Sequence, residues 1–588
     1  MNKLYFLLLG LIILLHTGCS QQTLSIYEPT VVGTPPRNAY IGLMRLDNGE
    51  IRHYTYSDNN KENRPFYIRS RDNGLTWDTV FVDNEWTGAD VKSPVSGEYI
   101  RLLSTDSGVV CTRSSGAIDG TWEPHLVYEP GPDEGRYIML KPPKFAKNGE
   151  RILVGAHSTK RIGCGVFFSD DDGLTWKRSA FVNAPPHQPR GKHKGTRWNH
   201  GAVEPTVVEL NDGRIWMLAR TARDKHYESF SDDGGETWSE MQPSRFYGTI
   251  TMPTIGRLDD GRLLLIWNNT TPLPEKARAD GHWEDVFTNR DVIHAAISDD
   301  DGKTWKGFRE LYLNPNRNDP DYAESDQSLS LDMSVQQNQF IELSDGKILV
   351  SLGQHALHRK LVKFDPAWLY ETSREDDFSD GLENWSTFLY KKGIVGHCAY
   401  NRAEGARLVP DPAGSGSQVM KIARPQNDEL ETPNQGAVWN FPALQKGVFE
   451  TRVYVPEGST GGKLSLLDRW FNPGDTTAFR DAMYHFDIEN LSAGVWHTLH
   501  FEWDLSESSD ECKVFDEEGH LIDQLPLHRA SVNGISYVHF ISDAKQPDEK
   551  GFFCWPRLCG RILMCFDNFS PAPASFRGVY SSGSGGID

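Results

Sequence analysis

Short apolar segments separated by polar turns occupy residues 25–372. The clearest unit is an apolar strand, a turn closing on glycine and a second apolar strand, with turn glycines at positions 49, 149, 213, 261 and 346. Glycine adopts positive φ at little steric cost, so apolar segments joined in this way are typical of β-hairpins. The pattern therefore predicts an all-β protein built from repeated hairpins.

A second hairpin alternates with the first. The pattern Ser-x-Asp-x-Gly-x-Thr-Trp occurs four times, at residues 70–77, 169–176, 231–238 and 298–305. Its Ser and Asp side chains suit a tight turn because they bond to nearby backbone amides. One hairpin of each kind makes a four-stranded blade. The interval between glycines 49 and 149 accommodates two blades, with a degenerate copy at 100–122. We therefore expect a six-bladed β-propeller over residues 25–372.

Four such Asp boxes on six blades resemble the sialidase (neuraminidase) superfamily. The boxes indicate the fold and say little about chemistry. The resemblance implies an axial site where three arginines bind the substrate carboxylate, because the planar guanidinium pairs with a carboxylate in bidentate fashion. It also implies a Tyr nucleophile with a Glu partner, and an Asp as acid/base. No metal or organic cofactor is implied.

Five residues match this site in part. Glu204 opens a strand and Arg220 ends the paired strand, as in the Glu and second Arg of the family. Arg290 precedes the strand that leads into the fourth box, as the third Arg does. Arg37 is the candidate for the first Arg, although Pro35-Pro36-Arg37 replaces the family's Arg-Ile-Pro. Asp58 lies in the stretch where the family has its acid/base.

The nucleophile departs from the family pattern. Gln337 stands about where the Tyr is expected, and an amide cannot act as a nucleophile at carbon. Tyr247 is the substitute candidate, on the hypothesis that it opens the first strand of blade five beside Glu204. A carboxylate there would take the phenol proton as the oxygen attacks.

A basic segment at residues 187–200 precedes Glu204 in an otherwise acidic chain. It predicts a loop over the site that faces an anionic sugar. Arg197 is its candidate for binding substrate, and His200 is a candidate general acid or base near neutral pH.

The composition changes near residue 375. Apolar and polar residues alternate over 448–455 and 496–503, which is typical of half-buried strands. Residues 376–553 resemble a laminin-G or concanavalin-like β-sandwich, a module that either binds glycans or packs against a catalytic domain. The strand pattern dissolves after Phe553, so residues 554–588 are expected to form an irregular tail.

Residues 1–19 resemble a secretory signal. Lys3 precedes an apolar run that is too short to span a bilayer. The end of the run, Thr17-Gly18-Cys19, is similar to a bacterial lipoprotein box, although His16 stands where Leu is usual. We expect export to the periplasm or the cell surface, with lipidation at Cys19 as the membrane attachment.

The net charge of the chain restricts the classes of binding partner. The chain has 61 Lys and Arg against 81 Asp and Glu, a net charge of −20, which argues against nucleic-acid binding. None of the eight cysteines has zinc-ligand spacing. The expected partner is a glycan with an acidic sugar, and the sequence leaves the oligomeric state open.

Three functions stay open. The first is an exo-acting sialidase-like glycoside hydrolase that removes a terminal acidic sugar. The second is another carbohydrate reaction on the same propeller, a glycosidase or lyase that uses His200. The third is a glycan-binding protein without catalysis, which the absent Tyr favours.

Overall fold

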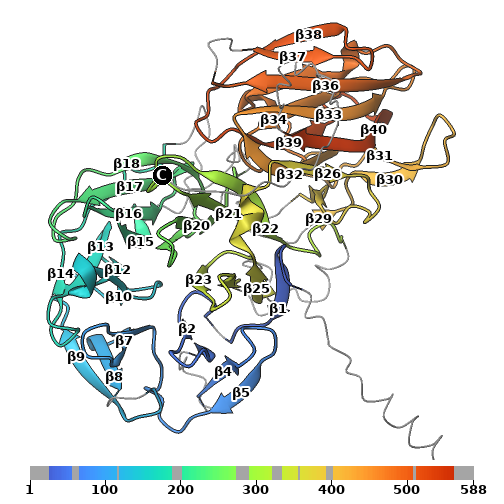
Figure 1. Cartoon of the computed structure of the whole chain (residues 1–588). Coiled ribbons are helices and arrows are strands. Elements are labelled where there is room, and N and C mark those ends of the chain that lie inside the picture. The colour runs from blue at the N-terminus through green and yellow to red at the C-terminus, as the bar shows by residue number, and fades with distance from the viewer. Residues whose placement is uncertain are drawn as a thin grey trace, which may run out of the picture.

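Six small antiparallel sheets form a closed ring (Figure 1), which confirms the expected propeller. The structure is a computed structural model. It describes residues 25–36, 38–55, 65–114, 118–188, 201–272, 290–320, 334–354, 358–392, 402–506 and 511–561. Over these residues every described helix is a short 3₁₀ turn, and none is long and apolar enough to cross a membrane.

The first three blades follow the chain in order. The first contains β2 (Leu43–Arg45), β3 (Ile51–Tyr54), β4 (Phe66–Ser70) and β5 (Asp78–Phe81). The second contains β6 (Val91–Lys92), β7 (Tyr99–Thr105), β8 (Gly108–Ser114) and β9 (Trp122–Tyr128). The third contains β10 (Tyr137–Ile138), β11 (Lys144–Ala146), β12 (Arg151–Ser158), β13 (Cys164–Ser169) and β14 (Lys177–Arg178), with the 3₁₀ turn η1 (Lys147–Gly149).

The last three blades complete the ring. The fourth contains β15 (Val203–Glu209), β16 (Ile215–Arg220), β17 (Lys225–Ser231) and β18 (Gln242–Tyr247). The fifth contains β19 (Thr254–Arg257), β20 (Leu263–Trp267), β21 (Val292–Ser298) and β22 (Lys306–Leu313). The sixth contains β23 (Asn338–Glu342), β24 (Ile348–Leu352), β25 (Lys360–Phe364) and β1 (Thr30–Gly33), followed by η5 (Pro366–Tyr370). Because β1 pairs with β25, the start of the described chain closes the ring.

The four Asp boxes form the turns that their sequence predicts. In the third blade, the Asp171 carboxylate accepts hydrogen bonds from Ser169 Oγ at 2.8 Å and from Thr175 Oγ1 at 2.6 Å. The Trp176 indole donates to Gly173 O at 3.0 Å. The box joins the third strand of a blade to the fourth, at the end of the strands opposite to Glu204 and Arg220. The boxes are therefore structural.

The propeller core lies between neighbouring blades. Trp216, Phe246 and Trp267 pack between the fourth and fifth blades and are at most 5% exposed. A similar cluster, which includes Phe167 and Tyr137, fills the space between the second and third blades. Burial of this aromatic surface stabilises the ring, because an isolated blade would expose an apolar face that the neighbouring blade covers.

The second unit is a β-sandwich. The larger sheet has the order β30-β31-β40-β33-β36-β37-β38, and β26 pairs with β40. Its strands are β26 (Ser373–Asp376), β30 (Arg407–Pro410), β31 (Gln418–Arg424), β33 (Lys446–Tyr454), β36 (Trp496–Asp504), β37 (Glu511–Phe515), β38 (Leu521–Pro526) and β40 (Asp548–Arg561).

The smaller sheet has the order β27-β32-β39-β34-β35, and β28 and β29 form a separate pair. These strands are β27 (Trp385–Ser386), β28 (Leu389–Tyr390), β29 (Arg402–Ala403), β32 (Gly436–Leu444), β34 (Lys463–Leu467), β35 (Tyr484–Asp487) and β39 (Ile535–Ile541). The 3₁₀ turns η6 (Ala478–Arg480) and η7 (Ile488–Asn490) flank β35.

Strand β40 extends beyond residue 553, where the sequence analysis ends the sandwich. The irregular tail was expected to begin at residue 554, but β40 continues to Arg561. It pairs with β31, β33 and β26. Main-chain hydrogen bonds on both edges hold such a strand without a regular alternation of side chains, which is the physical reason for the difference.

The smaller sheet of the sandwich packs against the fourth and fifth blades (Figure 1). The Tyr537 hydroxyl on β39 lies 2.5 Å from His294 Nε2 and donates to Glu310 at 2.8 Å. Asn440 on β32 donates to Phe308 O at 3.1 Å, and Trp470 N donates to Asn269 O at 3.0 Å. These contacts fix the sandwich to the propeller beside the end of the strands where Arg220 lies.

Candidate functional site

Three neighbouring blades have strained backbone at one end of the ring axis. Glu204 in β15, Ile250 before β19 and Gln337 directly before β23 have φ of 50°, 54° and 63°. Left-handed φ in a residue other than glycine costs about 1–2 kcal/mol, and a β-branched residue such as Ile250 is a clear outlier. Strain of this kind clusters at functional sites, where the surrounding structure imposes it.

The structure brings Glu204 and Arg220 together. Arg220 Nη1 donates to both carboxylate oxygens of Glu204 at 2.9 Å. The two side chains are only 10% and 8% exposed. The pair joins the first two strands of the fourth blade, because a bulge after Val203 turns the Glu204 side chain toward the end of β16. This contact agrees with the pairing expected from the sequence.

The environment of Glu204 keeps it ionised. Burial by itself raises the pKa of Glu204, but the charge and hydrogen bond of Arg220, together with the charge of Arg290, outweigh it, so the pKa is lowered. The backbone N–H of Glu204 also donates to His157 Nδ1 at 3.2 Å. An anionic carboxylate with cations around it can accept a proton from a nucleophile or stabilise a developing positive charge.

Arg290 influences Glu204 through its charge. It is 1% exposed, and its Nη2 donates to Ile250 O at 2.5 Å. Its carbonyl accepts a hydrogen bond from Val335 N at 2.9 Å, so Arg290 links the fifth and sixth blades. The influence of its charge on the pKa of Glu204 places the two groups in the same electrostatic environment. Arg220 therefore contacts Glu204 directly, and Arg290 affects Glu204 through its charge.

Lys141 is a residue that the sequence analysis missed. It follows β10 in the third blade, and its Nζ donates to Thr254 Oγ1 of the fifth blade and to Asn338 O of the sixth, the latter at 2.9 Å. Burial strongly lowers the pKa of Lys141, while Glu204 partly opposes that shift. The lysine ties three blades together across the axis.

His226 and an Asp90–Arg101 pair were also missed. His226 on β17 is fully buried, and burial lowers its pKa to about 3. Asp90, directly before β6, lies 3.9 Å from Arg101 Nε. Burial raises the pKa of Asp90 to about 6 against the opposing charge of Arg101. The only local signal for these residues is a polar side chain within an apolar strand segment.

The structure contradicts the hypothesis for Tyr247. It ends β18, the fourth strand of the fourth blade, and does not open a first strand. Its ring lies 3.8 Å from the Arg469 guanidinium, and its hydroxyl accepts a hydrogen bond from Arg529 Nη1 at 3.3 Å. Tyr247 therefore belongs to the contact with the sandwich. The sequence pattern places residues 246–249 at the start of the fifth blade, whereas Phe246 and Tyr247 end the fourth.

Gln337 stands where the sequence placed it, directly before the first strand of the sixth blade. Its carbonyl accepts a hydrogen bond from Gly353 N at 3.1 Å. This position offers an amide where the family implies a phenol. The other predicted residues, Asp58, His200, Arg37, Arg197 and Cys19, lie outside the described residues.

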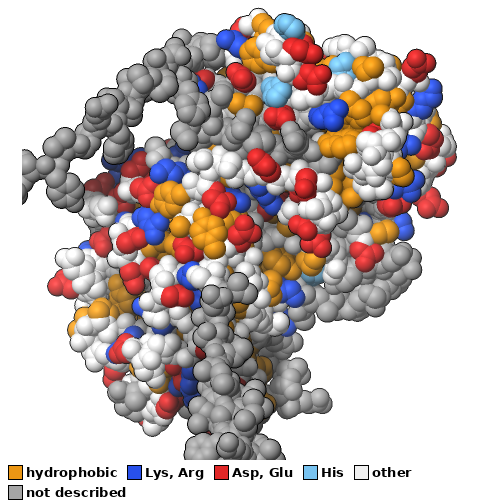
Figure 2. Space-filling view, turned by 45° about the vertical axis from the view of Figure 1, so that its right-hand side comes forward, with side chains coloured by type: hydrophobic (Ala, Val, Ile, Leu, Met, Phe, Trp, Pro, Cys, Tyr) orange, Lys and Arg blue, Asp and Glu red, His pale blue; other side chains and the backbone are white. Residues whose placement is uncertain are grey.

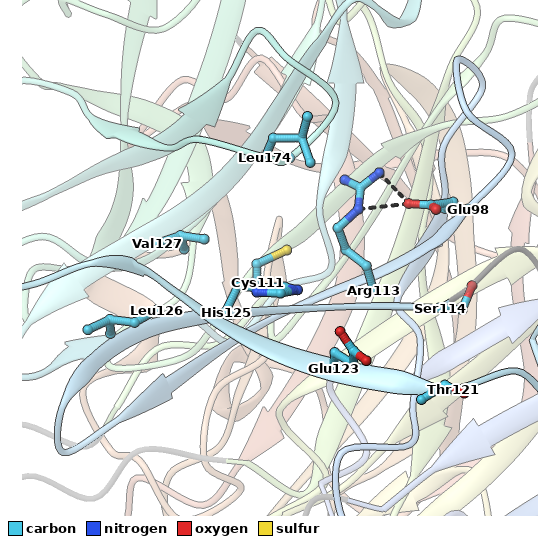
Figure 3. A pocket seen from close by; sticks show the side chains of 11 residues that line it. Glu98, Cys111, Arg113, Ser114, Thr121, Glu123, His125, Leu126, Val127 and Leu174 are labelled. Atoms are coloured by element: carbon cyan, nitrogen blue, oxygen red, sulfur yellow. Dashed lines mark hydrogen bonds and ion pairs between the residues drawn. The ribbon is translucent and has the colours of Figure 1, made fainter.

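A groove on the rim is a weaker candidate. It has a volume of about 460 Å³ and lies between the second and third blades, beside Gly173 and Leu174 of the third-blade Asp box. Figure 3 shows Arg113 and Glu98 pointing toward each other in it, and they form an ion pair. The box places this groove at the opposite end of the strands from Glu204, so it is separate from the axial site.

The face of the molecule drawn in Figure 2 carries no large patch of a single charge sign among its described residues. On the face shown in Figure 2, acidic and basic side chains are interspersed over the described residues.

The fold and this site define a six-bladed β-propeller with Asp boxes, joined to a β-sandwich. Residues 134–350 match the family model described as a BNR repeat-like domain. This match, together with the relative described below, supports an assignment of the propeller to the sialidase and BNR-repeat superfamily.

Comparisons with individual proteins are more distant. The anhydrosialidase of Macrobdella decora is 29% identical over 124 residues, which cover 21% of this chain and 14% of that protein. A Trypanosoma rangeli sialidase structure has a TM-score of 0.34 at 12% identity and covers 91% of this chain and 96% of its own. A Penicillium chrysogenum α-L-arabinanase structure has a TM-score of 0.35 at 13% identity, covering 58% and 98%.

Proposed function

We propose that the chain is a glycoside hydrolase that removes a terminal acidic sugar from a glycan, as sialidases do. The observation that carries the proposal is the buried pair of Arg220 with an ionised Glu204, whose pKa the charge of Arg290 also lowers. Guanidinium groups that stay charged at every physiological pH are suited to a sugar carboxylate. The relative that matches 124 residues of this chain is named an anhydrosialidase, which supports the same substrate class.

The reaction is proposed to use water in place of a tyrosine. Gln337 cannot form a covalent bond to the anomeric carbon, and Tyr247 lies at the sandwich contact. We propose that the bond between the anomeric carbon and the leaving oxygen breaks while water attacks the carbon. Glu204 accepts the proton of that water, and the leaving oxygen receives a proton from Asp58, its proposed donor.

The direct test is release of sugar from aryl glycosides of a sialic acid, a uronic acid and a neutral pentose. Arg220→Gln is expected to lower kcat/KM for the acidic substrate at least 100-fold, a loss within the range of removed charge-stabilising groups. Arg113→Gln is the matched control, because Arg113 forms a similar ion pair on the rim, and it is expected to keep activity within about threefold. Full activity of Glu204→Gln, or release of the pentose alone, would refute the proposal.

A second candidate is a glycan-binding protein without turnover. The amide at Gln337 favours it, because the family's nucleophile is missing. Saturable binding of the acidic glycoside, with no product released by the wild-type chain, would establish this alternative over hydrolysis.

We also propose that the chain is exported and carries a lipid on Cys19. The support is the segment from Lys3 to Cys19 and its small residues before the cysteine. Incorporation of labelled palmitate by the wild-type chain and not by Cys19→Ser is the expected result. Equal labelling of both chains would refute it.

A further inference from the structure

Aromatic side chains gather on the outward face of the larger sandwich sheet. In the strand register, Arg452 of β33 lies between Thr498 of β36 and Trp555 of β40. Tyr454 lies between Trp496 and Phe553 in the same way. The intervening residues Thr451, Val453, Leu499 and Cys554 are buried on the opposite side. Since side chains alternate along a strand, the aromatic residues and Arg452 share the face that points away from the core.

The rings contact one another in a defined arrangement. Trp496 and Trp555 meet edge to face, with centroids 5.5 Å apart and planes at 90°. The Tyr454 ring lies 5.5 Å from Trp496. The Arg452 guanidinium stands over both indoles, 5.4 Å from Trp496 and 5.3 Å from Trp555. Two cation–π contacts hold the charged fork in one position before any ligand arrives.

Trp496 Nε1 donates to Asp411 Oδ1 at 3.2 Å, so the fold uses one polar group of this cluster. Arg452 Nε is buried without a hydrogen-bond partner, and Arg452 forms no ion pair with a carboxylate in the described part of the chain. Trp496, Trp555, Tyr454 and Arg452 are half-buried, so part of each side chain faces outward. A half-exposed group of three large rings is unusual on the solvent face of a sandwich, where polar residues are the norm.

The cluster is separate from the axial site. The propeller contacts the smaller sheet, through Asn440 of β32 and Tyr537 of β39. The aromatic face belongs to the larger sheet and points the other way. Two packed sheets are about 10 Å apart, so the whole thickness of the sandwich stands between this face and the propeller.

We propose that Arg452, Tyr454, Trp496 and Trp555 form a second saccharide-binding site, and that its ligand is an acidic saccharide. The flat rings stack on the C–H faces of a sugar, which is how aromatic side chains bury apolar surface while leaving polar edges available. The Arg452 guanidinium pairs with the sugar carboxylate. Its charge is available to the ligand because it forms no ion pair within the described part of the chain. The site holds the glycan while the propeller acts elsewhere on the same polymer.

The test measures binding by the full chain to sialyllactose, oligogalacturonate and cello-oligosaccharide, by calorimetry. Binding is measured in the Arg220→Gln background, so that the axial site does not contribute. An acidic probe is expected to bind at one site, and both Arg452→Gln and Trp496→Ala are expected to weaken it at least tenfold. Lys513→Gln is the control, because Lys513 is an exposed cation on β37 of the same sheet.

Near-ultraviolet circular dichroism checks that each variant is folded. Arg452→Gln removes a charge but no aromatic ring, so its spectrum is expected to match that of the wild-type chain. Unchanged affinity in a folded Arg452→Gln chain overturns the proposal, and so does preference for the neutral probe. The result does not depend on the proposed function. If the chain releases no sugar but Arg452→Gln still abolishes acidic-probe binding, this site stands and hydrolysis fails.

Discussion

The buried pair of Glu204 and Arg220 gives a prediction whose size follows from the structure. The side chains are 10% and 8% exposed and share two contacts of 2.9 Å. Removing one partner of such a pair leaves a charge without compensation and costs about 3–5 kcal/mol. We expect Arg220→Met to lower the free energy of local opening by about this amount. Glu204→Gln should cost less, about 1–3 kcal/mol, because its amide oxygen still accepts a bond from Arg220.

The pair is best tested by a double-mutant cycle. Glu204→Gln combined with Arg220→Met removes both charges, so its cost should fall short of the sum by about 2–3 kcal/mol. Hydrogen exchange of the amides in β15 and β16 is the assay, because it reports local opening in a chain with two domains, where one global unfolding energy is not defined. A loss of about 3 kcal/mol corresponds to exchange roughly 100-fold faster.

The pH dependence checks the same reasoning. In the wild-type chain the pKa of Glu204 is lowered, so the stability it contributes is present above the pKa of the unfolded state and is lost on acidification. In Arg220→Met, burial is expected to raise the pKa instead, so the variant should lose stability as the pH rises. The coupling would be refuted if the cost in the double variant, measured by hydrogen exchange, equalled the sum of the two single-variant costs within about 0.5 kcal/mol, the usual scatter for independent sites.

Three further predictions concern stability. Asp171→Ala removes the carboxylate that anchors an Asp box and should cost about 2–3 kcal/mol without changing kcat/KM, which melting and activity measurements check; a lower kcat/KM would contradict the structural role. Tyr537→Phe leaves His294 and Glu310 without their shared hydroxyl and should speed cleavage between the domains in limited proteolysis, at a cost of about 1–3 kcal/mol; an unchanged cleavage rate would exclude it. Burial raises the pKa of Asp475 to about 6, so its charged form destabilises the fold as the pH rises through that value; Asp475→Asn should gain up to about 3 kcal/mol at pH 7.5 and little at pH 4, and a gain independent of pH would contradict the shift.

The propeller could be predicted because its signals are local. Each Asp box carries its hydrogen-bonding partners within a few residues, as Asp171 and Thr175 do, so the turn is encoded where it forms. The pairing of Glu204 with Arg220 is local for the same reason, since a single hairpin joins them. Both predictions required only the order of strands in one blade.

The residues that were missed depend on contacts between blades. Lys141 donates a hydrogen bond to Asn338, which is 197 positions away in the sequence. Asp90 and Arg101 form an ion pair in the second blade, whose sequence repeat is degenerate. Tyr247 was misassigned because Gly248 lies in a loop between the fourth and fifth blades, and the apolar pattern does not mark where one blade ends. The sequence pattern of one blade carries no information about the contacts that its side chains make with other blades.

The amide at Gln337 and the ionised state of Glu204 constrain the chemistry together. A tyrosine nucleophile needs a base beside it, and the carboxylate of Glu204 is maintained as an anion by Arg220 and Arg290 whether or not a phenol is present. Without the phenol, the same base has water as its available proton donor, and attack by water on the face opposite the leaving group inverts the anomeric carbon. Proton NMR of the first product formed therefore distinguishes the two chemistries. An inverted anomer supports direct attack by water, and a retained anomer requires a nucleophile other than Gln337.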